Sequence, residues 1–140
     1  MFSFLLNHTK TDVTSWNPDT VDDSRINLME NAYPETRWNF AVRHEAGRFR
    51  LLVRLSYWGD FYDREDGLNY PGEFLTDIEG TYMLSDSVSL SVGGQNVFNN
   101  YPERNPFAYT RLGNPYPQSS PSGFNGGYYM RLGFTWDRTF

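Results

Sequence analysis

The chain has 140 residues, enough for one domain, and a net charge of −5 that argues against nucleic acid as a partner. It contains no cysteine, which excludes a disulfide framework and thiolate metal sites. Aromatic residues make up 18% of the chain and hydrophobic residues only 39%, so many rings stand in a polar background. No apolar run approaches the ~18 residues that a membrane helix needs. A membrane strand is not detected in this way, because its lipid-facing apolar residues alternate with polar ones and the average hydropathy of any window stays low.

Alternation of apolar and polar residues predicts strands, and helical periodicity is hard to find. The first three predicted strands cover residues 2–13, 36–44 and 47–58. In the third, five apolar residues alternate with polar ones that include Arg50 and Arg54. Its length exceeds the ~5–6 residues typical of strands in globular proteins and suits the ~9–11 of a tilted membrane strand.

The last three predicted strands cover residues 74–84, 87–98 and 128–140. The final one alternates over its whole length and ends on the aromatic residue Phe140. The one charge in its apolar set, Arg138, lies near the end, where a long side chain can reach the headgroups.

Short and long connections alternate strictly along the chain. Residues 44–47 and 85–87 form tight hairpin turns, whereas residues 14–35, 59–72 and 99–127 form long connections. In an up-and-down meander this places all short turns at one end and all long loops at the other, as in outer-membrane barrels. The sequence therefore predicts an all-β protein, an antiparallel up-and-down meander of about six long strands in a transmembrane β-barrel.

A membrane strand turns one face to lipid and the other to the lumen, and a mid-bilayer charge on the lipid face costs roughly 2–4 kcal/mol. The residues predicted to face the membrane are Phe40, Val42, Leu51, Val53, Leu55, Ile78, Leu90, Met130, Leu132, Phe134 and Trp136. Charged residues of the opposite parity are Arg37, Arg43, Arg50, Arg54, Asp77, Glu79, Arg131 and Asp137. We expect Arg50 or Arg54 to pair with Asp77 or Glu79, and rings near strand ends to form girdles at the bilayer interfaces.

Three stretches of the chain and its terminal residue resemble TonB-dependent outer-membrane receptors. Residues 95–102 (QNVFNNYP) resemble the signature N-L-F-D-x-x-Y/P that follows the penultimate strand, and residues 115–129 (PYPQSSPSGFNGGYY) resemble the entry to the last strand. Residues 30–37 (ENAYPETR) resemble a stretch before another barrel strand, and Phe140 matches the terminal aromatic residue. Asn99, Ser122 and Gly127 depart from the residues usual in the family.

The resemblance implies that residues 1–140 are the carboxyl-terminal segment of a receptor β-barrel whose plug domain and remaining strands are absent. We therefore expect a truncated receptor or a fragment. The parent would reside in the cell outer membrane and import a scarce nutrient, such as a ferric siderophore, haem, cobalamin or a glycan, with energy reaching the missing plug through TonB. Its partners would be outer-membrane lipid, the rest of the receptor and the barrel-assembly machinery, which would recognise Phe134, Trp136 and Phe140.

Catalytic and metal chemistry find little support in the sequence. We expect no enzyme activity and no cofactor, and His8 and His44, the only histidines, suit interface or lumen positions. A weak cation site among Asp60, Asp63, Glu65 and Asp66 stays open, whereas Asp19, Asp22 and Asp23 are expected to be solvated surface.

The longest loop offers candidate ligand contacts. Its rings and arginines suit the capture of an anionic or aromatic ligand, and the candidates are Arg104, Tyr109, Arg111 and Tyr116. A packed cap over the barrel mouth explains the same composition.

Two further classes of protein stay open at this point. A soluble β-sandwich also alternates, and its exposed rings would make it a carbohydrate-binding module. An outer-membrane enzyme barrel is the third possibility, with His44 as the residue to test.

Overall fold

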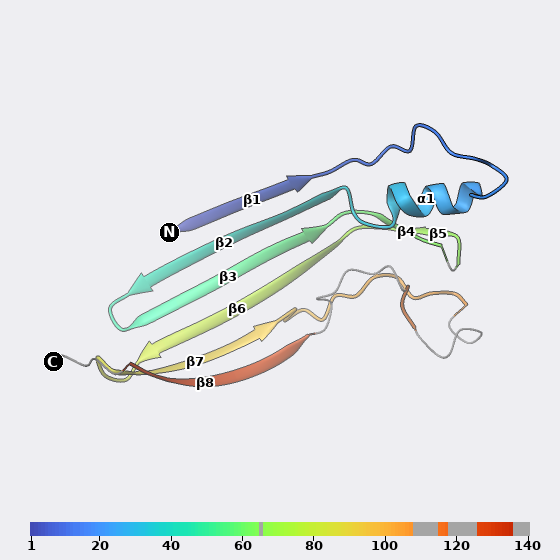
Figure 1. The fold of residues 1–140 in the computed structure, drawn as a ribbon. Coiled ribbons are helices and arrows are strands. Elements are labelled where there is room, and N and C mark those ends of the chain that lie inside the picture. The colour runs from blue at the N-terminus through green and yellow to red at the C-terminus, as the bar shows by residue number, and fades with distance from the viewer. Residues whose placement is uncertain (65, 108–114, 118–125, 136–140) are drawn as a thin grey trace.

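The described residues form one six-stranded antiparallel sheet, a separate two-stranded hairpin and one helix (Figure 1). The computed structural model describes residues 1–64, 66–107, 115–117 and 126–135. The large sheet has the order β1-β2-β3-β6-β7-β8, in which neighbours in space are also the next long strands along the chain. Its strands are β1 (Phe2–His8), β2 (Thr36–Ala46), β3 (Phe49–Trp58), β6 (Glu73–Met83), β7 (Val88–Gln95) and β8 (Gly127–Phe134). The prediction of an antiparallel meander of six strands is therefore confirmed.

Two strands end earlier than predicted. The first was expected to reach residue 13, but β1 ends at His8, which pairs with Thr36, the first residue of β2. One more backbone hydrogen bond follows this pair, from the Thr9 N–H to the Glu35 carbonyl at 2.8 Å, and the strand pairing ends there. The fifth was expected to reach residue 98, but β7 ends at Gln95. The predicted last strand is described as far as Phe134, and residues 136–140 lie outside the described residues.

All long connections leave the same end of the sheet, as predicted, and both tight turns lie at the other end (Figure 1). The β2–β3 turn contains Gly47, whose φ of 58° is the left-handed conformation that glycine adopts without steric cost. The β6–β7 turn closes through hydrogen bonds that the backbone N–H groups of Leu84 and Ser85 donate to the Val88 carbonyl, at 2.8 and 3.1 Å.

The first long connection contains a helix that the sequence analysis missed. Helix α1 (Asp23–Asn31) begins after Asp22, whose Oδ1 accepts a hydrogen bond from the Arg25 backbone N–H at 2.7 Å. Asp22 is therefore the N-cap of a helix, and its side chain is exposed, as expected, like those of Asp19 and Asp23.

The second long connection folds back as a hairpin of β4 (Phe61–Asp63) and β5 (Leu68–Tyr70). The rings of Phe61 and Tyr70 stack across it with centroids 5.4 Å apart, and Tyr62 reaches Ser24 of α1 at 3.4 Å. The buried hydrophobic residues all belong to the long-loop end: Ile26, Ala32, Phe61, Tyr62, Tyr70 and Leu75. In the described part of the chain, the hydrophobic core thus lies under the loops and not against the apolar residues of the sheet.

A turn of two left-handed asparagines follows β7. Asn96 and Asn99 have φ values of 45° and 56°, and Asn96 exchanges hydrogen bonds with Asn100, from Nδ2 to the Asn100 carbonyl at 2.7 Å and from the Asn100 N–H to Oδ1 at 3.0 Å. The turn is attached to β6, because the Asn96 N–H donates to Asp77 Oδ1 at 2.9 Å and the Val97 N–H to the Thr76 carbonyl at 2.8 Å. The stretch that resembles the receptor signature is thus a clamp that ends β7 against its neighbour.

The strands are staggered across the sheet. The β2–β3 turn is centred between Gly47 and Arg48, and extending the β3–β6 pairing places these residues opposite Leu84 and Met83. The β6–β7 turn is centred on Asp86, which lies more than two residues farther along the chain than this level between Met83 and Leu84. Two steps between strands therefore shift the register by more than two residues, roughly one residue per strand.

Replacement of Asn96 by alanine tests the clamp. We expect Asn96→Ala to lower the free energy of unfolding by about 2–4 kcal/mol, since alanine in the left-handed conformation costs ~1–2 kcal/mol and the side-chain hydrogen bonds are lost. Asn96→Gly relieves the backbone strain alone and should cost about 1 kcal/mol less. Denaturant titration measures both variants, with Gln95→Ala, at an exposed neighbouring position, as the control. Equal loss in all three variants would contradict this role of the turn.

Candidate functional site

The register places every described residue of the predicted membrane-facing set on one face of the sheet. Val42, Val53 and Ile78 lie directly opposite one another in β2, β3 and β6, and directly opposite residues share a face. We call this surface the apolar face; its large side chains are Phe2, Phe4, Leu6, Trp38, Phe40, Val42, Phe49, Leu51, Val53, Leu55, Tyr57, Phe74, Ile78, Tyr82, Val88, Leu90, Val92, Tyr128, Met130, Leu132 and Phe134. The predicted Trp136 lies outside the described residues.

Charged residues of the six strands lie only on the other surface, the polar face. Within the described strands, no Asp, Glu, Lys or Arg has the register of the apolar face. The nine charged strand residues on the polar face are Arg37, Arg43, Glu45, Arg50, Arg54, Glu73, Asp77, Glu79 and Arg131. The two faces of the described sheet therefore differ sharply in polarity.

The apolar face is uncovered. None of its large side chains is buried, and Phe4, Met130 and Phe134 are 62%, 74% and 74% exposed. The described residues provide a second sheet of only two short strands, and it lies at the long-loop end (Figure 1). The described part of the chain is thus a single layer whose apolar surface has no protein partner.

Rings gather at both ends of the apolar face. At the long-loop end Trp38 lies 5.8 Å from both Tyr57 and Phe74 and 6.1 Å from Phe4, measured between ring centroids. At the short-turn end Phe49 is paired with Tyr82. The two levels are eight residues apart in β3 and in β6, about 27 Å along a strand.

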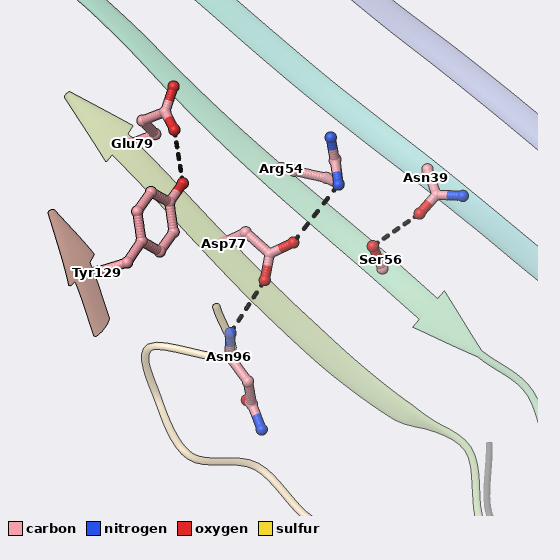
Figure 2. Close-up of polar contacts among 7 residues, drawn as sticks. All are labelled: Asn39, Arg54, Ser56, Asp77, Glu79, Asn96 and Tyr129. Carbon is pink, nitrogen blue, oxygen red and sulfur yellow. Dashed lines mark hydrogen bonds and ion pairs between the residues drawn. The ribbon is translucent and has the colours of Figure 1, made fainter. Parts of the chain in front are cut away.

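The polar face is connected by hydrogen bonds and ion pairs between strands (Figure 2). Arg54 Nη1 lies 3.7 Å from Asp77 Oδ2, and the other oxygen of Asp77 accepts from the Asn96 N–H. The predicted pairing of Arg54 with Asp77 is confirmed, whereas Arg50 pairs with Glu45, at 3.5 Å. Asp77 therefore links β3, β6 and the turn after β7.

A second carboxylate joins β6 to β8. Glu79 Oε2 accepts from the Tyr129 hydroxyl at 2.6 Å and from Arg131 Nη2 at 2.8 Å (Figure 2 shows the tyrosine contact). Between them, Gly93 of β7 lies under the tyrosine ring, so that an added Cβ would be 2.6 Å from Tyr129 Cζ. The absence of a side chain at Gly93 lets Tyr129 cross β7 to reach Glu79.

The four candidate ligand residues of the longest loop are only partly described. Arg104 is exposed, whereas the Tyr116 ring stacks on Tyr101 with centroids 5.1 Å apart. Pro117, beside Tyr116, is fully buried, so this part of the loop is packed against other residues of the chain. Tyr109 and Arg111 lie outside the described residues.

The three residues of the expected assembly signal are likewise only partly described. Phe134 is the last residue of β8 and is exposed on the apolar face. Trp136 and Phe140 lie outside the described residues.

Two carboxylates of the acidic hairpin, those of Asp60 and Asp66, accept hydrogen bonds from the hairpin itself. Asp60 Oδ1 accepts from the Gly72 N–H at 2.9 Å, and Asp66 accepts from the Leu68 N–H at 3.0 Å and from the Tyr70 hydroxyl. Burial, followed by the hydrogen bond to Asp66, raises the pKa of Tyr70, which keeps the phenol protonated. Glu65 lies outside the described residues, among which no group of three His, Cys, Asp or Glu side chains could hold a metal ion.

The two histidines lie in strands of the large sheet, His8 in β1 and His44 in β2. His8 Nδ1 lies 2.9 Å from Thr36 Oγ1 at the long-loop end, and His44 shares the register of the apolar face near the short-turn end.

A cavity of about 550 Å³ on the polar face was not foreseen. It lies at the long-loop end, between α1 and the ends of β1, β2 and β3, and its lining includes Asn7, Met29, Arg37, Asn39 and Trp58. The sequence alternation assigned Arg37 to the correct face, but only the register shows which residues of three strands surround it.

Comparison of the chain with protein-family models, curated proteins and solved structures gave no match. In the described part of the chain, no helix has both the length and the apolar character required to cross a membrane.

Substitution of Gly93 tests the contact between Tyr129 and Glu79. We expect Gly93→Ala to lower the free energy of unfolding by about 1–3 kcal/mol, because its methyl group would displace the Tyr129 ring. Gly80→Ala is the matched control in the neighbouring strand, where the new Cβ would meet the Phe49 ring at 3.6 Å, an ordinary contact. Denaturant titration of both variants measures the difference; equal stability would show that Tyr129 does not need the gap.

Proposed function

We propose that the chain is the carboxyl-terminal part of the β-barrel wall of a TonB-dependent outer-membrane receptor, with its apolar face toward lipid and its polar face toward the lumen. The observation that carries this proposal is the confinement of charge to one face of an otherwise uncovered sheet.

The free energy of the exposed side chains indicates that the apolar face must be covered. Burying a Val, Leu, Ile or Phe side chain contributes ~1.5–3 kcal/mol, so a face with this many large apolar residues forgoes tens of kcal/mol in water. A typical domain has a net stability of only ~5–15 kcal/mol. Water is therefore an unfavourable medium for this face, which supports covering by lipid or by a second protein layer.

Lipid accounts for more of the observations than a second layer does. Outer-membrane barrels carry an apolar band ~25 Å tall between aromatic girdles, with strands tilted by ~35–45°. The stagger of roughly one residue per strand, with ~3.3 Å per residue and ~4.8 Å between strands, corresponds to a tilt of about 35–40° when the turns lie at one level. At that tilt the two levels of rings are about 21 Å apart in height, close to the expected band.

The edges of the sheet favour a larger barrel. In the described residues β1 and β8 each pair on one side only. An unpaired backbone N–H or C=O in hydrocarbon costs several kcal/mol, so lipid tolerates a sheet only when every strand is paired. We infer that further barrel strands pair with β1 and β8.

The function follows from the resemblance. The parent receptor would import a scarce nutrient such as a ferric siderophore, haem, cobalamin or a glycan, with energy supplied through TonB and the plug. This chain would supply wall, outer loops and, through Phe134, Trp136 and Phe140, the signal for the barrel-assembly machinery. No catalytic step is assigned to it.

Nitroxide labels at two adjacent residues test which face meets lipid. Because the chain has no cysteine, Val53→Cys and Arg54→Cys each create one site for labelling, on opposite faces at mid-strand. In lipid vesicles that contain the chain assembled with the remaining strands of its barrel, we expect the label at residue 53 to be relaxed mainly by oxygen, which concentrates in lipid. The label at residue 54 should be relaxed mainly by a water-soluble nickel chelate.

Two results would overturn the proposal. One is a label at residue 53 that neither reagent reaches, as expected for a face buried beneath a second sheet. The other is a chain that stays monodisperse in water without vesicles or detergent, which would favour the soluble carbohydrate-binding sandwich.

A further inference from the structure

We infer that the cavity under helix α1 is a binding site for a small ligand that carries carboxylate groups, with Arg37 as its anchor. The inference rests on the proposed function and deepens it, because the cavity lies on the face that would line the lumen, at the end of the long loops.

Two rows of side chains form the floor of the cavity. Asn7, Arg37 and Trp58 are directly opposite one another in β1, β2 and β3, and Leu5 and Asn39 form the next row. Met29 and Glu30 of α1 close the site from the loop side. The volume of about 550 Å³ falls within the ~300–1,000 Å³ typical of small-molecule sites.

Arg37 is a preorganised cation without a carboxylate partner in the described residues. Its guanidinium lies over the Trp58 ring, 4.8 Å from the centroid. Arg50, Arg54 and Arg131 of the same face are each paired with Glu45, Asp77 or Glu79. Stacking uses the face of the guanidinium and leaves its in-plane N–H donors available for two parallel bonds to a carboxylate.

The neighbouring amides also present donors. Asn39 Oδ1 accepts from the Ser56 hydroxyl at 2.7 Å, and Asn7 Oδ1 accepts from the Thr9 hydroxyl at 3.0 Å. With the oxygens so occupied, the Nδ2 groups are the part of each amide left to bind a ligand.

The one acidic side chain among the described residues of the lining is engaged by the loop. Glu30 Oε1 accepts a hydrogen bond from the Val13 backbone N–H at 2.8 Å, so that carboxylate oxygen is held by the loop. The lining therefore offers donors around one cation, beside the apolar walls of Leu5, Met29 and Trp58. A ligand with carboxylate groups matches this arrangement better than a cation does.

Calorimetric titration with citrate, a tricarboxylate, tests the inference on the full chain in detergent micelles. We expect saturable binding that Arg37→Gln weakens at least tenfold and Arg37→Lys weakens less, because lysine keeps the charge but not the planar fork. Arg43→Gln is the matched control, since Arg43 lies six residues along the same strand on the same face, outside the cavity lining, and is without an ion pair in the described residues. A second variant, Asn39→Asp, places a like charge beside the anion and should also weaken binding at least tenfold.

The results that would overturn the ligand site can be told apart from those that would overturn the proposed function. Absence of citrate binding, equal loss in Arg43→Gln, or displacement of citrate by the neutral sugar maltotriose would overturn the inference. Labels at residues 53 and 54, introduced into each variant, report whether the sheet still faces lipid. Lost binding with the lipid pattern intact contradicts the ligand site alone, whereas loss of that pattern in the otherwise unaltered chain contradicts the receptor proposal.

Discussion

The structure depends on one constraint, the unbroken antiparallel register of six strands. Side chains alternate with a period of two, so a slip of one residue between β3 and β6 would move Arg50 and Arg54, or Asp77 and Glu79, onto the apolar face. Under the proposed function, each such charge would cost roughly 2–4 kcal/mol in hydrocarbon, far more than a single surface contact contributes. Segregation of charge thus selects the register, and the register in turn creates the polar contacts that link the strands.

Much of the sheet could be predicted from the sequence because a period of two is a local property. The alternation of apolar and polar residues around Val53 and Arg54 assigns these two residues to opposite faces of the sheet. This assignment does not require the partner strand to be known. The ends of strands were harder, since β1 stops where its partner does, at Thr36, and β7 stops where Asn96 takes a left-handed backbone. These ends depend on another segment or on a turn, and alternation records neither.

The elements of the long-loop end were missed for a different reason. Helix α1 buries only Ile26 and shows no clear apolar stripe, so helical periodicity is absent although the capping residue Asp22 is present. The β4–β5 hairpin has only three residues in each strand and is held by the Phe61–Tyr70 stack. The cavity depends on the pairing of Asn7 with Arg37, residues 30 apart in sequence that only tertiary structure brings together.

The packed cluster formed by α1 and the β4–β5 hairpin makes the loop end an ordered unit with its own buried residues. Phe61, Tyr62 and Tyr70 are buried among loop residues, away from the apolar face and whatever covers it. If this end projects from a cell, the surface offered to the immune system is a conformational epitope. Antibodies raised against short linear peptides of this region would then bind the intact protein poorly.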